Sequence, residues 1–78
     1  MILKIVDFNF TREYDWTFKL SDKDGNEIYV MDKSFYERNG IPDPIGRKEI
    51  DSLDRGDKLD CDISFLEDRP VVIKIHSY

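Results

Sequence analysis

The chain has 78 residues, with 12 Lys and Arg against 17 Asp and Glu, a net charge of −5 and a single cysteine. This length supports one domain with a small hydrophobic core. One cysteine excludes an intramolecular disulfide and leaves a structural zinc site short of sulfur ligands. The excess of acidic residues weakens long-range attraction to nucleic acid or anionic lipid, although a local basic patch remains compatible with it.

The first residues, Met1 to Asp7, lack the basic start and the longer apolar run of a signal peptide. No stretch approaches the roughly 18 consecutive apolar residues that a membrane helix needs. We therefore expect a cytoplasmic protein without a membrane partner, folded as a single domain over residues 1–78.

Five segments show the period-two alternation and the β-branched or aromatic content of strands. The first, from Ile2 to Phe10, is apolar on both faces at its start, which favours a central or bent strand. The apolar positions of the other four are, in chain order, Trp16, Phe18 and Leu20, then Ile28 and Val30, then Leu59, Cys61, Ile63 and Phe65, and finally Val71, Ile73 and Ile75 after a turn at residues 67–70.

A long spacer separates the third strand from the fourth. Glycine and proline crowd its middle, from Asn39 to Gly46, which predicts an ordered loop or short turns. Further along the spacer, the apolar residues Ile50 and Leu53 lie three apart, as on one face of a helix, and either Asp43 or Asp51 could cap such a helix. We expect a short helix within Arg47 to Leu53.

The segment Ser21 to Ile28 reads S-D-K-D-G-N-E-I and opens like a calcium-binding loop. Counted from Asp22, however, the sixth place holds Glu27 where an EF-hand needs glycine, and the twelfth holds Lys33 where it needs a bidentate glutamate. Both flanks alternate at period two, whereas a calcium loop lies between helices. These mismatches favour a β-hairpin turn, and no metal site is predicted.

The length of this hairpin loop determines which side chains share a face of the sheet. A two-residue loop at Asp24 and Gly25 would pair Leu20 with Tyr29. A three-residue loop instead opposes Leu20 to Ile28, and it places the glycine where a left-handed residue is needed. The apolar pattern selects the three-residue loop. The core then receives Trp16, Phe18, Leu20, Ile28 and Val30, and the opposite face carries Thr17, Lys19, Tyr29 and Met31.

The layout of three strands, a spacer with a short helix or turn, and two further strands resembles the OB-fold, a five-stranded antiparallel Greek-key barrel. The resemblance covers nearly the whole chain. Phe18 to Ile28 looks like the hairpin between the second and third strands, and Leu53 to Leu59 like the entry to the fourth. An SH3-like barrel is the alternative, and the long spacer favours the OB-like form. Met31 to Arg38, with two adjacent aromatic residues, would either cap this barrel or form an interface.

The resemblance also implies a binding face, because OB-like domains bind oligonucleotides or oligosaccharides across their second and third strands and two flanking loops. Tyr29 would stack on a base and Lys19 would meet a phosphate. We therefore expect a non-catalytic binding module for single-stranded nucleic acid or, alternatively, for a protein partner, and the oligomeric state stays open. Carried onto this chain, the face consists of Arg12, Tyr14, Thr17, Lys19, Tyr29, Met31 and Arg69.

The remaining reactive side chains do not form a catalytic pattern. Cys61 lies on the inward side of the fourth strand, where a thiol behaves as a small hydrophobe. A catalytic thiol would need a base nearby, and His76 is the only histidine. Asp60 and Asp62 point the same way and form either a weak cation site or a solvated acidic edge. We expect neither enzymatic activity nor a cofactor.

Overall fold

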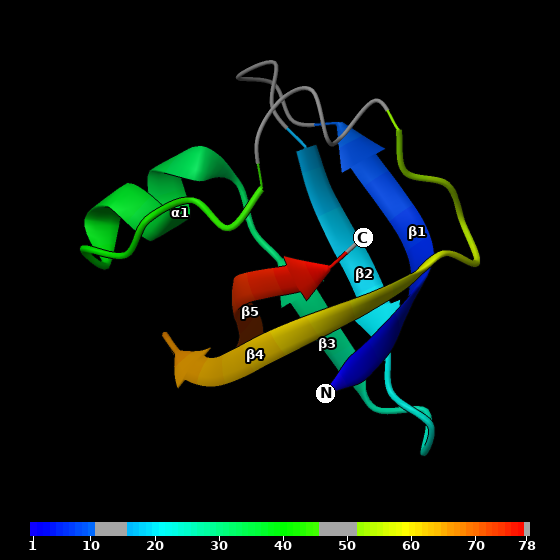
Figure 1. The fold of residues 1–78 in the computed structure, drawn as a ribbon. Helices are drawn as coiled ribbons and strands as arrows, with labels where there is room; N and C mark the ends of the chain where they lie inside the picture. The colour runs from blue at the N-terminus through cyan, green and yellow to red at the C-terminus, as the bar shows by residue number, and fades with distance from the viewer. Residues whose placement is uncertain (11–15, 46–51, 78) are drawn as a thin grey trace.

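The computed structural model describes residues 1–10, 16–45 and 52–77. Five strands close into a barrel in the order β1-β2-β3-β5-β4, and one short helix, α1, lies in the connection between β3 and β4 (Figure 1). The predicted OB-like five-stranded barrel, with a short helix between its third and fourth strands, is confirmed. The elements are β1 (Ile2–Phe10), β2 (Trp16–Ser21), β3 (Glu27–Val30), α1 (Lys33–Arg38), β4 (Lys58–Leu66) and β5 (Arg69–Ser77).

One pair of neighbouring strands in the barrel is parallel. β3 and β5 run in the same direction and meet at Tyr29 and Val71, whereas the other four pairs are antiparallel. Parallel strands need a long crossover connection rather than a tight turn. Here the crossover consists of α1, the spacer and β4. The expectation of an antiparallel barrel is therefore wrong at this one seam, where the spacer provides the length that an OB-like crossover requires.

The hairpin between β2 and β3 has the predicted register. Leu20 lies opposite Ile28, and Phe18 lies opposite Val30. Gly25 has a φ of 84°, in the left-handed region where a side chain would be strained. The three-residue loop is thus confirmed, because this register is the one that turns the apolar side chains of both strands inward.

The barrel core continues along β1 through a bulge. Leu3 and Ile5 are fully buried, and the register with β2 shifts between Ile5 and Asp7. Val6, the extra residue, is 42% exposed. A bulge adds one residue to a strand and bends it, so Phe8 returns toward the core, where its ring meets Phe18 edge-to-face at a centroid distance of 4.9 Å. The expectation that this strand bends is consistent with the bulge.

The simple alternation predicted for the fourth and fifth strands is wrong beyond Cys61. Leu59 and Cys61 are fully buried, but Phe65 is 74% exposed. Register shifts between Asp60 and Cys61 and again between Asp62 and Ile63 interrupt the pairing of β4 with β5. At each shift the extra residue lies on β5, His76 at the first and Ile73 at the second, so the period-two pattern breaks along β5, where Val71 and Val72 are both fully buried. Trp16, expected in the core, is only partly buried against it.

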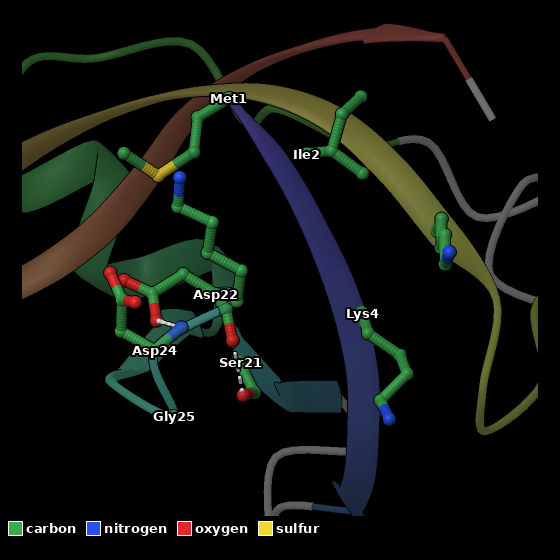
Figure 2. A pocket seen from close by; sticks show the side chains of 9 residues that line it. Met1, Ile2, Lys4, Ser21, Asp22, Asp24 and Gly25 are labelled. Carbon is green, nitrogen blue, oxygen red and sulfur yellow. Dashed lines mark hydrogen bonds between the residues drawn. The ribbon is translucent and has the colours of Figure 1, made fainter.

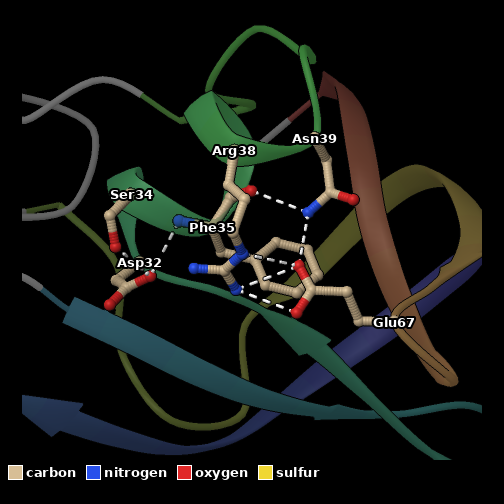
Figure 3. Close-up of polar contacts among 6 residues, drawn as sticks. All are labelled: Asp32, Ser34, Phe35, Arg38, Asn39 and Glu67. Atoms are coloured by element: carbon tan, nitrogen blue, oxygen red, sulfur yellow. Dashed lines mark hydrogen bonds and ion pairs between the residues drawn. The ribbon is translucent and has the colours of Figure 1, made fainter.

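Helix α1 caps the barrel, one of the two roles considered for its segment. Phe35 and Tyr36 are buried, and the Tyr36 hydroxyl donates to the Val72 carbonyl at 2.6 Å. The Asp32 carboxylate caps the first turn by accepting from the Phe35 N–H at 3.1 Å (Figure 3). The helix expected within Arg47 to Leu53 falls mainly on residues 46–51, which lie outside the described residues, and the described end of that range is not helical.

The other end of α1 is attached to the turn between β4 and β5. The Arg38 guanidinium donates twice to the Glu67 carboxylate, each time at 2.9 Å, and Asn39 Nδ2 donates to the same carboxylate at 2.7 Å (Figure 3). Glu67 and Asp68 have φ values of 50° and 62°. Two such residues form the tight hairpin turn that usually takes asparagine or glycine. The hydrogen bonds to Glu67 help to hold a residue that disfavours this conformation.

Candidate functional site

The outer face of the barrel carries polar side chains in rows that the strand register sets. Lys4, Lys19 and Tyr29 each lie between two buried neighbours on their strands, so their side chains point outward, and the residues paired with them across the strands lie on the same face. The first row crosses β1, β2 and β3 and consists of Asp7, Lys19 and Tyr29. The second row lies nearer the β2–β3 loop and consists of Lys58, Lys4, Ser21 and Glu27.

Lys19 and Tyr29, the two residues expected to meet phosphate and base, are direct cross-strand neighbours. Both are also bound to Glu27. The Tyr29 hydroxyl donates to Glu27 Oε2 at 3.0 Å, and Lys19 Nζ lies 3.8 Å from Glu27 Oε1. The hydrogen bond to the carboxylate raises the pKa of Tyr29, so the phenol stays neutral. A ligand phosphate at Lys19 must therefore compete with Glu27.

Lys19 also faces an acidic residue on its other side. Asp7 is its partner across β1 and β2, and Arg55 Nη2 lies 2.7 Å from Asp7 Oδ1. The hydrogen bond from Arg55 is the main cause that lowers the pKa of Asp7. Positive and negative side chains thus alternate across this face, in the order Arg55, Asp7, Lys19, Glu27. The face is charge-balanced rather than basic.

The other predicted site residues contribute unequally. Thr17 lies two residues before Lys19 on the same outer side of β2, and its hydroxyl donates to the Asn9 carbonyl at 3.5 Å. Met31 is partly buried against the core. Arg69 is exposed at the start of β5. Its positive charge acts to lower the pKa of Tyr29, whereas Glu27 raises it. Arg12 and Tyr14 lie outside the described residues.

Glu27 and Asp7 are the members of this site that sequence reasoning did not assign to it. The place of Glu27 two residues before Tyr29 on the third strand is a signal that both side chains share a face. Asp7 faces Lys19 only because the bulge in β1 shifts the register between Ile5 and Asp7. The sequence gives no sign of where this bulge lies, so Asp7 could not be assigned to the face in advance.

The loop that opens like a calcium site is held by its own first aspartate. Asp22 Oδ1 accepts from the N–H groups of Asp24 and Asn26, both at 2.9 Å, and Asp22 Oδ2 accepts from Asn26 Nδ2 at 3.0 Å. The hydrogen bonds from Asn26 are the largest causes that lower the pKa of Asp22. This is an aspartate-stabilised turn, which agrees with the hairpin interpretation. Within the described ranges, no group of three or more His, Cys, Asp or Glu side chains is placed to hold a metal ion.

The side chains of Cys61 and His76 have different surroundings: the thiol is buried, whereas the imidazole contacts Asp62. Burial raises the pKa of Cys61 to about 11, so the thiol is protonated at neutral pH and is a weak nucleophile. His76 Nε2 lies 2.9 Å from Asp62 Oδ2, a contact that lowers the pKa of Asp62. Asp60 contacts the terminal ammonium of Met1 at 3.1 Å. The two carboxylates expected to form a pair therefore each have a partner of their own.

The chain matches no model of a known protein family, no curated protein and no solved structure. In the part of the chain that the structure describes, no helix has the length and apolar character needed to cross a membrane. Function is therefore inferred from the side chains themselves.

Proposed function

We propose that this protein is a non-catalytic binding module that takes single-stranded nucleic acid across the outer face of β2 and β3. The proposal is carried by the cross-strand pair of Lys19 and Tyr29, which lie side by side and partly exposed on an OB-like barrel. A cation beside an aromatic ring is the pairing with which sequence-tolerant single-strand binders hold phosphate and base. Arg69 adds a second exposed cation near the ring.

The acidic residues of the face determine how such binding would behave. Glu27 forms an ion pair with Lys19, and Asp7 lies beside Lys19 on the neighbouring strand β1. A phosphate at Lys19 is therefore attracted less strongly than it would be at an unpaired cation. The net charge of −5 also opposes the approach of a polyanion. Affinity is therefore expected to be modest and to fall steeply with salt. Stacking on Tyr29 then contributes a large share of the binding free energy, about 1–3 kcal/mol.

Titration of isotope-labelled protein with mixed single-stranded DNA or RNA at low salt tests the proposal. Chemical shifts should change locally at Thr17, Lys19, Tyr29 and Met31. Tyr29→Ala should weaken binding by about 1–3 kcal/mol, and Lys19→Ala should flatten the salt dependence by about one phosphate contact. If neither nucleic acid produces localised shifts on this face, nucleic-acid binding is rejected.

The Glu27 contact offers a sharper test. Glu27→Gln keeps the length of the side chain and an oxygen that can accept from the Tyr29 hydroxyl, but it removes the negative charge that pairs with Lys19. Binding should become tighter. Glu37→Gln is the matched control, because it removes one negative charge from an exposed position on α1 that pairs with Lys33. An equal gain in both variants would mean that only the net charge matters and that Lys19 does not receive the phosphate.

A protein partner is the second candidate, and Phe65 favours it. This ring is 74% exposed, more than any other large apolar side chain in the described ranges. It lies on β4 opposite Pro70, close to the β4–β5 turn. Exposed aromatic side chains are typical of protein interfaces. A photocrosslinking residue in place of Phe65 should give a discrete adduct in cells, whereas the same residue in place of Lys74 should not; equal patterns would remove this candidate.

A further inference from the structure

A hollow of about 710 Å³ lies beside the proposed binding face, between the start of β1, the β2–β3 loop and the start of β4 (Figure 2). Lys4, Lys23 and Lys58 are among the residues that line it. In Figure 2 the side chains of Ile2 and Lys4 project from the same side of β1. The hollow includes three members of the second row, so it continues the outer face on which Lys19 and Tyr29 lie.

The cations of this hollow differ from most other cations in the part of the chain that the structure describes. Lys19, Lys33, Arg38 and Arg55 each form an ion pair. Within the described ranges, the Lys and Arg side chains that form no ion pair are Lys4, Lys23, Lys58, Arg69 and Lys74. Three of these five line the hollow, so most of the unpaired cations in the described ranges lie around it.

Two of the lysines are placed unfavourably in the free protein. Lys4 and Lys58 are direct partners in the pairing of β1 with β4, and both are exposed. Like charges directly opposite each other destabilise a sheet. An anion bound between the two ammonium groups would remove this repulsion.

The carboxylates of the hollow do not neutralise these lysines. Both oxygens of Asp22 accept hydrogen bonds from within the loop, which keeps that carboxylate turned toward Asn26. Asp24 is exposed, and its negative charge, together with that of Asp22, opposes an anion in the hollow. Three cations therefore face two carboxylates, one of which is already engaged in the turn.

We propose that this hollow is an anion site that takes a phosphate group between Lys4 and Lys58, with Lys23 approaching from the β2–β3 loop. Lysine binds phosphate as a flexible point charge and needs no fixed fork geometry. The phosphate belongs either to a free phosphate or polyphosphate or to a nucleic-acid backbone that continues from Lys19 past Ser21. Only the second source rests on the proposed function.

Thermal unfolding with inorganic phosphate, tripolyphosphate or an oligothymidylate, each at matched ionic strength, tests the site together with chemical-shift titration. A ligand that binds only the native state raises the unfolding midpoint. We expect such a rise, with shifts at Lys4, Lys23 and Lys58. Lys58→Gln should raise the midpoint without phosphate, because the opposed charges are relieved, and should abolish most of the rise that phosphate causes. Lys74→Gln, with the same change in net charge on β5, should do neither. Asp24→Asn should strengthen the effect.

The outcomes separate the two sources and the two proposals. Shifts at the hollow with inorganic phosphate or tripolyphosphate identify a free phosphate as the ligand, and shifts with oligothymidylate alone identify the backbone. With oligothymidylate, shifts at the hollow and an unperturbed Tyr29 support the anion site while the proposed function fails, and the reverse result with all three probes overturns the anion site alone. The site is also overturned if no probe shifts the hollow or if Lys58→Gln and Lys74→Gln respond alike.

Discussion

Replacing Tyr36 with phenylalanine tests what attaches α1 to the barrel. Tyr36 is fully buried, and its hydroxyl donates to the Val72 carbonyl at 2.6 Å and accepts from the Met31 N–H at 3.3 Å. Its ring packs edge-to-face on Phe35 at a centroid distance of 5.6 Å. Phenylalanine keeps the ring and removes both hydrogen bonds, so the variant isolates the polar part of the contact.

The size of the effect follows from the partners that lose this hydroxyl. A typical hydrogen bond contributes about 1 kcal/mol net, and a buried partner left unsatisfied costs about 1–3 kcal/mol. The bond to Met31 is long, so most of the loss falls on the Val72 carbonyl. We expect Tyr36→Phe to lower the free energy of unfolding by about 2 kcal/mol, a large part of the roughly 5–10 kcal/mol available to a domain of this size.

The same variant changes the alkaline limb of the stability curve. Burial raises the pKa of Tyr36 above its ordinary value of 10.0. The folded phenol stays protonated while the unfolded phenol ionises, so its contribution to stability is complete below about pH 10 and is lost as the pH rises further. Tyr36→Phe has no such phenol, and its stability should fall less between about pH 10 and pH 11 than that of the parent.

Urea denaturation at pH 7 and at several alkaline pH values measures both effects. Tyr29→Phe is the matched control, because it removes a hydroxyl that binds the exposed Glu27 at the surface, and its cost should stay within about 0.5 kcal/mol. The reasoning is refuted if Tyr36→Phe costs no more than Tyr29→Phe at pH 7, or if its alkaline limb matches that of the parent.

Three further predictions concern the core, the helix cap and the thiol. Phe18→Ala should cost about 3–5 kcal/mol in urea denaturation and Tyr29→Ala about 1 kcal/mol or less, and reversed costs would contradict the assignment of the two faces of β2 and β3. Asp32→Ala should cost about 1 kcal/mol and Asp32→Asn less, because asparagine still caps the Phe35 N–H; equal losses would point to charge rather than to the cap. The pKa of Cys61 is raised from 9.0 to about 11. The thiol should therefore lower stability from about pH 9 upward, by up to about 2 kcal/mol at pH 11, so Cys61→Val should lose less stability over this range than the parent, and an equal decline in both would exclude the thiol as a cause.

The sequence alone determined the local pairing of this protein. Alternation along β2 and β3, with one glycine in the connecting loop, was enough to predict that Leu20 faces Ile28 and that Lys19 lies on the outer side. The register of a hairpin depends on residues that are close together in the chain, and here only one register turns the apolar side chains of both strands to the same side. The same reasoning gave the five strands and the OB-like layout, and it brought Lys19 and Tyr29 together as candidate site residues.

The tertiary structure decided what depends on contacts between distant segments. The bulge in β1 exposed Val6 despite its apolar character, because the strand bends there to close the barrel. Phe65 is exposed near the β4–β5 turn although it alternates with the buried residues of β4. Helix α1 formed over only Lys33–Arg38, too short to show a helical period, and its stability comes from contacts made elsewhere in the chain. Its Tyr36 reaches a carbonyl 36 residues away.

The candidate sites show the same division. Pairing of β1 with β4 set Lys4 opposite Lys58, residues that are remote in the chain, and barrel closure brought Arg69 near Tyr29. Neither approach follows from a local period, since each depends on where the crossover returns the later strands. A local pattern specifies which side of a strand a side chain occupies, whereas only the closed barrel specifies which charges from other strands lie beside it.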